Sequence, residues 1–235
     1  MEAEINKEKR DYLLPASILV AAILISGSII YLVGSKSGGG VGAKDTGELA
    51  AIKETAPLKT SDRDVILGDP KAPVTLIEFG DYQCPFCGRF FEQVEIPLRE
   101  NYIKPGKVKM VFRNFQFLGP ESIAAAEAAE CAKDQKQFWA FHDALYETEI
   151  KDGRENNGNL NKDLFLKLAD ELKLDHSAFA SSFDSKKYVG QVEKDTDNAK
   201  ALGVNSTPTT FVNSQKLVGA LPYAQFKAAI DSILK

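Results

Sequence analysis

The sequence is poor in the residues that most often mark metal sites and nucleic-acid surfaces. Its 235 residues include only 3 cysteines, 2 histidines and 1 tryptophan. Lysine and arginine, 29 together, are outnumbered by 33 acidic residues, and the net charge is −4. Because phosphate binding needs a surplus of positive charge, we expect no nucleic-acid partner. A composition of 44% hydrophobic and 26% charged residues is typical of a globular protein.

One long hydrophobic run lies near the N-terminus, at residues 13–33, where no residue is charged. A helix of this length crosses a hydrocarbon core of about 30 Å at about 1.5 Å per residue. A cleaved signal peptide has an apolar stretch of only about 7 to 15 residues, although small residues at 41–43 are compatible with cleavage. A buried soluble helix would need a neighbouring chain that covers it. We therefore predict a single transmembrane helix at 13–33.

The charges around this run predict its orientation. Lys7, Lys9 and Arg10 precede it closely, whereas only Lys36 follows it closely. By the positive-inside rule, residues 1–12 then form a cytoplasmic tail. The stretch 34–61 has the Gly- and Ser-rich composition of a flexible linker, with room for a short helix around 49–54. We predict a single-pass protein, held in the membrane lipid by this helix, with an extracytoplasmic domain at 62–235.

The apolar pattern of residues 62–235 predicts an α/β domain. Short apolar runs at 74–79 and 108–112 are typical of central strands. Helical spacing between them, over 86–102, indicates a crossover helix and hence a parallel βαβ unit. The remaining predicted elements are a helical block over about 120–202, strands at 209–212 and 216–218, and a helix at 223–234. This order describes a thioredoxin-like sheet interrupted by a helical insertion.

Cys84 and Cys87, with Pro85 and Phe86 between them, lie where the first predicted strand ends and the crossover helix begins. If Cys84 is the N-cap, Pro85 takes the first helical position, where a fixed φ and a missing N–H are tolerated. Cys87 then follows one turn later on the same face, within reach of a disulfide. The helix N-terminus favours a thiolate on Cys84 and lowers its pKa. An exposed thiolate beside a second thiol is suited to thiol-disulfide exchange.

Other interpretations of the cysteine pair remain open. A structural disulfide is permitted outside the cell, but so short a ring constrains the unfolded chain only weakly. A metal site could recruit Cys131 or His142, but no second Cys-x-x-Cys or histidine pair completes a tetrahedron. We expect neither a metal nor a cofactor. Cys131 is predicted as a small core residue of an alanine-rich helix, and His142 as a packing or surface residue.

Five further segments carry a resemblance to a known family: GDPKAPV at 68–74, EFGDYQ at 78–83, AAECA at 128–132, QFWAFHD at 137–143 and GVNSTP at 203–208. Together with the cysteine motif, they resemble the thioredoxin-fold disulfide oxidoreductases, and among these the membrane-anchored bacterial proteins similar to DsbA. The resemblance covers nearly all of residues 62–235. It implies that the helical insertion caps the active-site face.

The resemblance also assigns roles to individual residues. It implies that Pro208 follows a cis peptide bond and that Thr207 offers its backbone to an extended substrate, next to Pro85 and Phe86. Glu78 stands where relatives carry an acid that moves a proton to or from the buried cysteine. The alternative for Glu78 is an acid at a strand end that reaches water.

The implied function is the donation of the Cys84–Cys87 disulfide to cysteine-containing secreted or envelope proteins. The implied partner is an integral-membrane reoxidase similar to DsbB or to vitamin K epoxide reductase. Strong oxidases of the family often carry histidine where this chain has Phe86, so we expect a less oxidising couple. A reductase or isomerase of the same fold is one alternative. A non-enzymatic metal carrier or peptide-binding module is another.

Overall fold

The computed structural model describes residues 53–235. The predicted tail, the predicted transmembrane helix and most of the predicted linker lie outside the described residues. Within residues 53–235, no helix combines the length and the apolar character needed to cross a membrane.

The described residues form a five-stranded mixed sheet in the order β1-β5-β4-β2-β3. β2 (Val74–Gly80) and β3 (Val108–Asn114) are parallel. β4 (Thr209–Val212) is antiparallel to β2, and β5 (Gln215–Val218) is antiparallel to β4. β2 is almost entirely buried, as its near-continuous apolar run predicts. Because both faces of β2 are covered, an ionisable side chain in this strand is enclosed whichever face it points to.

β1 (Lys53–Glu54) comes from the segment predicted as linker. It pairs antiparallel with residues 215–216 of β5. An edge strand offers a row of unpaired N–H and C=O groups, and β1 satisfies some of them. The folded part therefore includes residues before 62, and residues 53 and 54 are extended instead of belonging to the short helix considered for 49–54.

The predicted crossover between β2 and β3 is confirmed as a run of helical elements. They are α2 (Pro85–Phe90), the π-helical η1 (Phe91–Glu95), α3 (Ile96–Leu98) and the π-helical η2 (Arg99–Ile103). Pro97, which has no N–H to donate, lies between the two π-helical stretches. Phe90, Val94 and Leu98 pack in one core cluster with Phe226 of α9 (Tyr223–Ile233). This packing fixes the helix whose first turn carries both cysteines of the motif.

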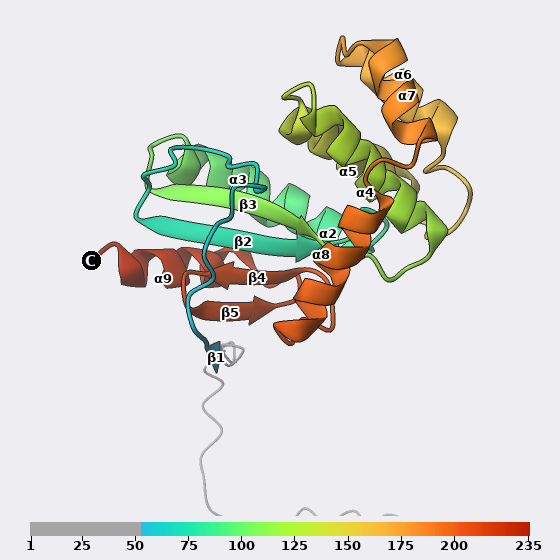
Figure 1. Cartoon of the computed structure of the whole chain (residues 1–235). Coiled ribbons are helices and arrows are strands. Elements are labelled where there is room, and N and C mark those ends of the chain that lie inside the picture. The colour runs from blue at the N-terminus through green and yellow to red at the C-terminus, as the bar shows by residue number, and fades with distance from the viewer. Residues whose placement is uncertain (1–52) are drawn as a thin grey trace, which may run out of the picture. The chain divides into compact units, whose positions relative to one another are not determined.

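The predicted helical insertion is also confirmed. Five helices of the described chain form it: α4 (Pro120–Lys133), α5 (Phe138–Asp152), α6 (Lys162–Glu171), α7 (His176–Asp184) and α8 (Val189–Ala201). In Figure 1 the insertion lies beyond the ends at which β2 and β3 finish. Buried apolar side chains of α4, α5, α6 and α7 belong to the same core cluster as Cys84 and Cys87. The insertion therefore forms one wall around the cysteines.

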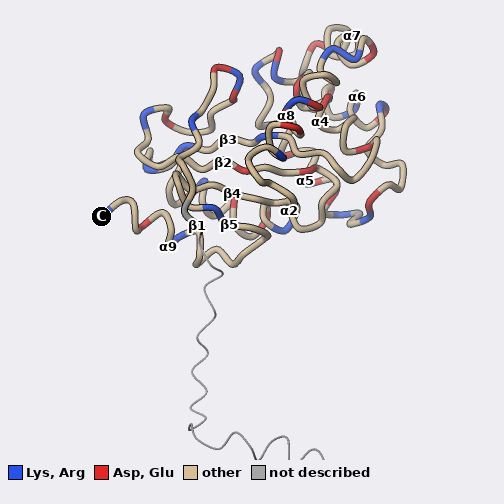
Figure 2. The backbone as a smooth tube through the Cα atoms, turned by 60° about the horizontal axis from the view of Figure 1, so that its bottom comes forward, with Lys and Arg blue, Asp and Glu red and all other residues tan. Residues whose placement is uncertain are grey.

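Charged residues of both signs are interspersed along the helices and loops of the described part (Figure 2). Among the exposed pairs, Lys187–Asp134 joins two segments of the insertion, and Lys227–Asp231 lies within α9. Pairs of this kind contribute at most about 1 kcal/mol each, because water and salt screen them. Charged side chains inside the domain interact more strongly, because water does not screen them there.

Candidate active site

The cysteine motif lies at the junction between β2 and α2. Cys84 is the N-cap, with extended backbone angles of −73° and 118°, and Pro85 is the first helical residue. The Cys84 N–H donates to the carbonyl of Asp81, whose carboxylate accepts a hydrogen bond from the Gln83 N–H. The Gly88 N–H donates to the Cys84 carbonyl. These bonds confirm the predicted helix start.

The two cysteines occupy different environments. Cys84 is 6% exposed, and Cys87 is fully buried. A hydrogen bond from the Cys87 thiol is the main reason that the pKa of Cys84 falls to about 6. Burial opposes this effect, while Thr207 and the backbone of Phe86 support it. Burial, followed by the interaction with Cys84, raises the pKa of Cys87. The thiolate therefore resides on Cys84.

The second half of the site comes from the loop before β4. The peptide bond between Thr207 and Pro208 is cis, as the resemblance implies. The Thr207 carbonyl accepts a hydrogen bond from the Cys84 thiol, with a sulfur–oxygen distance of 3.6 Å. Thr207 and Pro208 are buried, whereas Pro85 and Phe86 are exposed. Cys84 is thus largely covered, which corrects the exposed thiol predicted from the sequence.

Glu78 is completely buried in the central strand β2. Neither of its carboxylate oxygens has a hydrogen-bond partner among the described residues. Burial raises its pKa well above the ordinary value, and the negative charges of Glu95 and Cys84 raise it further, while Arg99 lowers it. The side chain points inward and does not reach water, which resolves the two orientations considered from the sequence.

Glu95 and Arg99, whose charges act on Glu78, belong to a buried charged cluster that the sequence did not reveal. Glu95 and His142 are both fully buried, with His142 Nε2 3.5 Å from Glu95 Oε1. Arg99 donates to Glu95 Oε1 and, through two nitrogens at 2.7 Å, to Asp143. The Tyr82 hydroxyl lies 3.2 Å from His142 Nδ1. The available signal was a Glu and an Arg spaced by four within the crossover helix.

Ligand atoms of Glu95, His142 and Asp143 lie within 4.8 Å of one another. Arg99 donates hydrogen bonds to both carboxylates, so its guanidinium already supplies the positive charge there. His142 faces Glu95 and Tyr82, not the cysteine motif. This arrangement gives no support to a metal site that recruits His142 to the cysteine pair.

Cys131 lies on α4 and is 1% exposed. Burial raises its pKa to about 11, and the polar groups that act on it include Ser182 and Glu127. These are neighbours in the helical insertion. The prediction of a small core residue is confirmed.

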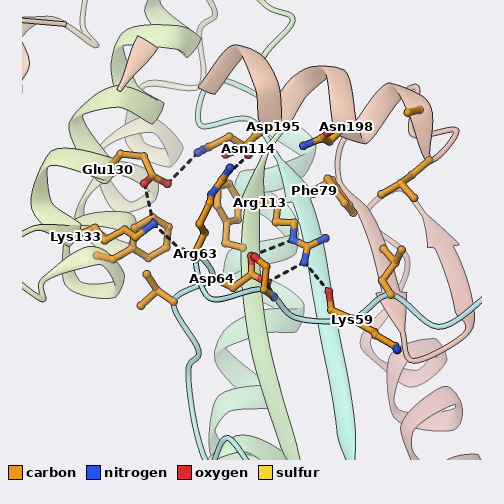
Figure 3. Close-up of a pocket in the computed structure, with 17 residues that line it drawn as sticks. Lys59, Arg63, Asp64, Phe79, Arg113, Asn114, Glu130, Lys133, Asp195 and Asn198 are labelled. Atoms are coloured by element: carbon orange, nitrogen blue, oxygen red, sulfur yellow. Dashed lines mark hydrogen bonds and ion pairs between the residues drawn. The ribbon is translucent and has the colours of Figure 1, made fainter. Parts of the chain in front are cut away.

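Two of the cavities in the described part of the chain bear on the search for a site. One of about 530 Å³ lies between residues 58–65, β3, α4 and α8 (Figure 3). Six of its charged side chains form three ion pairs, Arg63–Asp195, Arg113–Asp64 and Lys133–Glu130. It contains neither the cysteine motif nor the cis-proline. The other cavity, of about 170 Å³, adjoins Cys84 between α2 and the end of α5, where Ile150 contributes to its lining.

A thiol pair at a helix N-terminus, with the first thiolate stabilised and the second thiol buried, is built for disulfide exchange. Its position after the central strand, opposite a cis-proline, defines the class of thioredoxin-fold thiol-disulfide oxidoreductases. The chain belongs to the thioredoxin family, because the family model described as Thioredoxin matches residues 60–232.

Individual relatives narrow this assignment. The chain is 33% identical over 173 residues to disulfide bond formation protein D of Bacillus subtilis (strain 168), which covers 72% of this chain and 77% of that protein. It is 36% identical over 173 residues to the probable disulfide bond formation protein D of Bacillus anthracis, with coverages of 72% and 77%. Oxidised BdbD from Bacillus subtilis has a similar structure, with a TM-score of 0.69, 30% identity and coverages of 79% and 99%.

These comparisons confirm the resemblance to DsbA-like oxidoreductases and the thioredoxin-like fold with its helical insertion. The chain is a homologue of disulfide bond formation protein D. It is a thiol-disulfide oxidoreductase whose Cys-x-x-Cys motif is Cys84–Cys87.

Proposed function

We propose that the chain is a membrane-tethered extracytoplasmic oxidase that donates its disulfide to cysteine-containing secreted or envelope proteins. The observation that carries this proposal is the position of Cys84 as the N-cap of α2 beside the buried Cys87 thiol, an arrangement that lowers the pKa of Cys84 to about 6. Stabilising the thiolate stabilises the reduced protein and makes its disulfide a stronger oxidant. Because Phe86 stands where strong oxidases of the family often carry histidine, we expect an oxidase weaker than DsbA.

The exchange proceeds in two steps. A substrate thiolate attacks Cys84 Sγ, the bond between Cys84 and Cys87 breaks, and Cys87 leaves as a thiolate. A second substrate thiolate then attacks the substrate sulfur of the mixed disulfide and displaces Cys84. The enzyme gains two electrons and the substrate gains a disulfide. The low pKa of Cys84 makes it a good leaving group in the second step.

Glu78 is the proposed proton donor to Cys87 in the first step. Cys87 is fully buried, and burial raises its pKa, so its thiolate must be neutralised inside the domain. Glu78 is buried with it, and the charges of the two groups interact. Because a raised pKa keeps the Glu78 carboxyl protonated, the proton is present when Cys87 leaves.

The proposed substrate surface consists of Pro85, Phe86, Thr207 and Pro208. Phe86 is 51% exposed beside Cys84 and offers an apolar contact. An extended peptide that approaches Cys84 passes the backbone before the cis-proline. The small cavity next to Cys84 has room for one side chain of such a peptide.

The membrane assignment rests on the sequence. Residues 13–33 carry no charge, and the basic residues before them place residues 1–12 in the cytoplasm. The linker then presents the catalytic domain on the outer side, close to a reoxidase in the same membrane. A quinone-linked reoxidase similar to DsbB or vitamin K epoxide reductase is the partner that we propose.

The redox equilibrium of the full chain in detergent, measured in glutathione buffers by alkylation and mass shift, tests the direction of exchange. A potential well above about −200 mV would support disulfide donation. A potential near about −270 mV, as in thioredoxin, would overturn the oxidase in favour of a reductase. Tight metal binding by the reduced protein, with no disulfide formed in any buffer, would instead support the metal carrier.

A further inference from the structure

The buried cluster around Glu95 is not used in the exchange steps, yet the charges of Glu95 and Arg99 act on their proposed proton donor, Glu78. We infer that Glu95, held by His142 and Arg99, is a positioning residue that keeps the exchangeable proton on Glu78. It thereby sets the pH at which Cys87 can enter the exchange. This inference rests on the proton-transfer role proposed for Glu78.

The two carboxyl groups share an enclosed space but have unequal support. Both Glu78 and Glu95 are 0% exposed. Glu95 accepts hydrogen bonds from Arg99 and faces the His142 ring, whereas Glu78 has no hydrogen-bond partner among the described residues. When two carboxylates interact in a buried site, the second ionisation is strongly disfavoured. The supported group takes the negative charge, so the proton remains on Glu78.

The groups that face Glu95 come from three directions. Arg99 lies on η2, four residues further along the same helical run. His142 and Asp143 lie on α5, and Glu78 lies on β2. Burial acts to raise the pKa of Glu95, but the charges and hydrogen bonds of His142 and Arg99 outweigh it and lower the pKa. Arg99 and His142 therefore both favour the ionised form of Glu95.

The groups that face Glu78 and His142 complete this environment. The charges of Cys84 and Cys87 interact with the charge of Glu78. Tyr82 contacts His142 Nδ1, and the Tyr146 ring packs edge-on against His142 with centroids 4.9 Å apart. Burial raises the pKa of both tyrosines well above the ordinary value, so they remain neutral. Glu95 is thus the carboxylate whose charge acts on Glu78 in this enclosure.

This arrangement controls the movement of a proton between Glu78 and Cys87. When Cys87 leaves, the Glu78 O–H bond breaks and the proton moves to the Cys87 sulfur. Glu78 and Glu95 are then both negatively charged, and their repulsion favours the uptake of a new proton from water by Glu78. In the reverse direction, Cys87 gives its proton to the Glu78 carboxylate before it attacks. Glu95 therefore resets Glu78 to its protonated form after each turnover.

The experiment follows Cys87 as it displaces glutathione from Cys84. Reduced protein is mixed with oxidised glutathione, quenched with acid at intervals and measured by mass, over a range of pH. Cys87 attacks Cys84 Sγ, the bond to glutathione breaks, and glutathione leaves as a thiolate that water protonates. The rate should rise with pH, with an inflection where Glu78 ionises. In Glu95→Gln this inflection should fall by about one pH unit, a tenfold loss of proton affinity.

Asp143→Asn is the matched control. It removes the other carboxylate that holds Arg99, but Asp143 does not count among the charges that act on Glu78. We expect it to leave the inflection in place. A shift as large in Asp143→Asn as in Glu95→Gln would overturn the inference, because general damage to the cluster would then explain both.

Glu78→Gln distinguishes a wrong role for Glu78 from a wrong role for Glu95. If the wild-type inflection persists in Glu78→Gln, the proposed role of Glu78 is wrong and the inference is overturned with it. If the inflection disappears in Glu78→Gln but is unmoved in Glu95→Gln, only the role of Glu95 is wrong. Should Glu95→Gln not fold, carboxyl carbon NMR of the wild-type protein decides. Glu95 ionised while Glu78 still titrates supports the inference, and the opposite order overturns it.

Discussion

The Cys84 thiol donates a hydrogen bond to the carbonyl oxygen of Thr207 at 3.6 Å, directly before the cis peptide bond to Pro208. This contact joins residues that are 123 positions apart in the chain. It places the reactive sulfur against backbone that a substrate peptide would meet. The contact also explains why Cys84, although it is the reactive cysteine, is only 6% exposed.

The first prediction separates the reactive cysteine from the structural one. Cys84→Ala should abolish disulfide exchange with a reduced test protein, because no other described thiol combines a lowered pKa with access to substrate. Cys131→Ala should retain exchange within about twofold, since Cys131 is 1% exposed and its pKa is raised to about 11. The measurement is the rate of disulfide formation in the test protein. Exchange that survives in Cys84→Ala would remove the basis of the proposed mechanism.

The second prediction concerns the source of the low pKa of Cys84. Its main cause is the hydrogen bond from the Cys87 thiol. Cys87→Ala removes this donor, so the pKa of Cys84 should rise above about 6 toward its ordinary value of 9.0. Cys87→Ser keeps an O–H donor and should raise the pKa less. The ultraviolet absorbance of the thiolate against pH measures both. A Cys84 pKa that stays at about 6 in both variants would show that the backbone N–H groups are sufficient.

The third prediction tests the residue between the cysteines. Phe86→His places an imidazolium next to the Cys84 thiolate at a side chain that is 51% exposed, so little packing is lost. The reduction potential should become more positive by about 30 mV, a tenfold change in the redox equilibrium. Phe86→Gln is the control for losing the ring and its contact with Arg89. A similar increase with glutamine would assign the effect to the lost ring instead of the added charge.

The fourth prediction uses the pH dependence of stability. The pKa of Glu78 is raised in the folded protein, so the folded state binds more protons than the unfolded state above the ordinary carboxyl pKa of 4.5. The stabilising contribution of Glu78 is complete below that pH and is lost as the pH rises through the folded pKa. Glu78→Gln cannot ionise. Its free energy of unfolding should match that of the wild type in acid and exceed it increasingly toward neutral pH. The full difference should be about 1.4 kcal/mol for each pH unit between the unfolded-state and folded-state pKa values of Glu78.

Urea unfolding of the reduced protein at several pH values measures this difference. Glu92→Gln, an exposed carboxyl on η1, serves as the control and should show no comparable trend. A stability difference between Glu78→Gln and the wild type that is constant at all pH values would mean that Glu78 has the same proton affinity in both states.

The sequence predicted the elements that local patterns determine. Val74 to Phe79 forms a strand because its apolar run suits a position enclosed on both faces. Cys84 caps α2 because the residue after it is a proline suited to the first helical position. The alanine-rich stretch around Cys131 forms a helix and buries that thiol. In each case, neighbouring residues supply most of the physical cause.

Contacts between segments far apart in the chain decided the burial of Glu78, the cluster around Glu95 and the extension of the sheet. Whether Glu78 reached water depended on the elements that pack over β2. Glu95 and Arg99 gave a weak signal, because their partners His142 and Asp143 lie more than 40 residues away on α5. The extension of the sheet by residues 53–54 depended on the free edge of β5.

By itself, the sequence determined the order of the elements, the position of the cysteine pair at a helix start and the proline before β4, since these follow from local backbone preferences and apolar periodicity. Only the tertiary structure decided how far Cys84 is covered and which carboxyl group bears the charge beneath it. Solvent exclusion and the distances between charges control both, and these depend on segments that meet only when the chain folds.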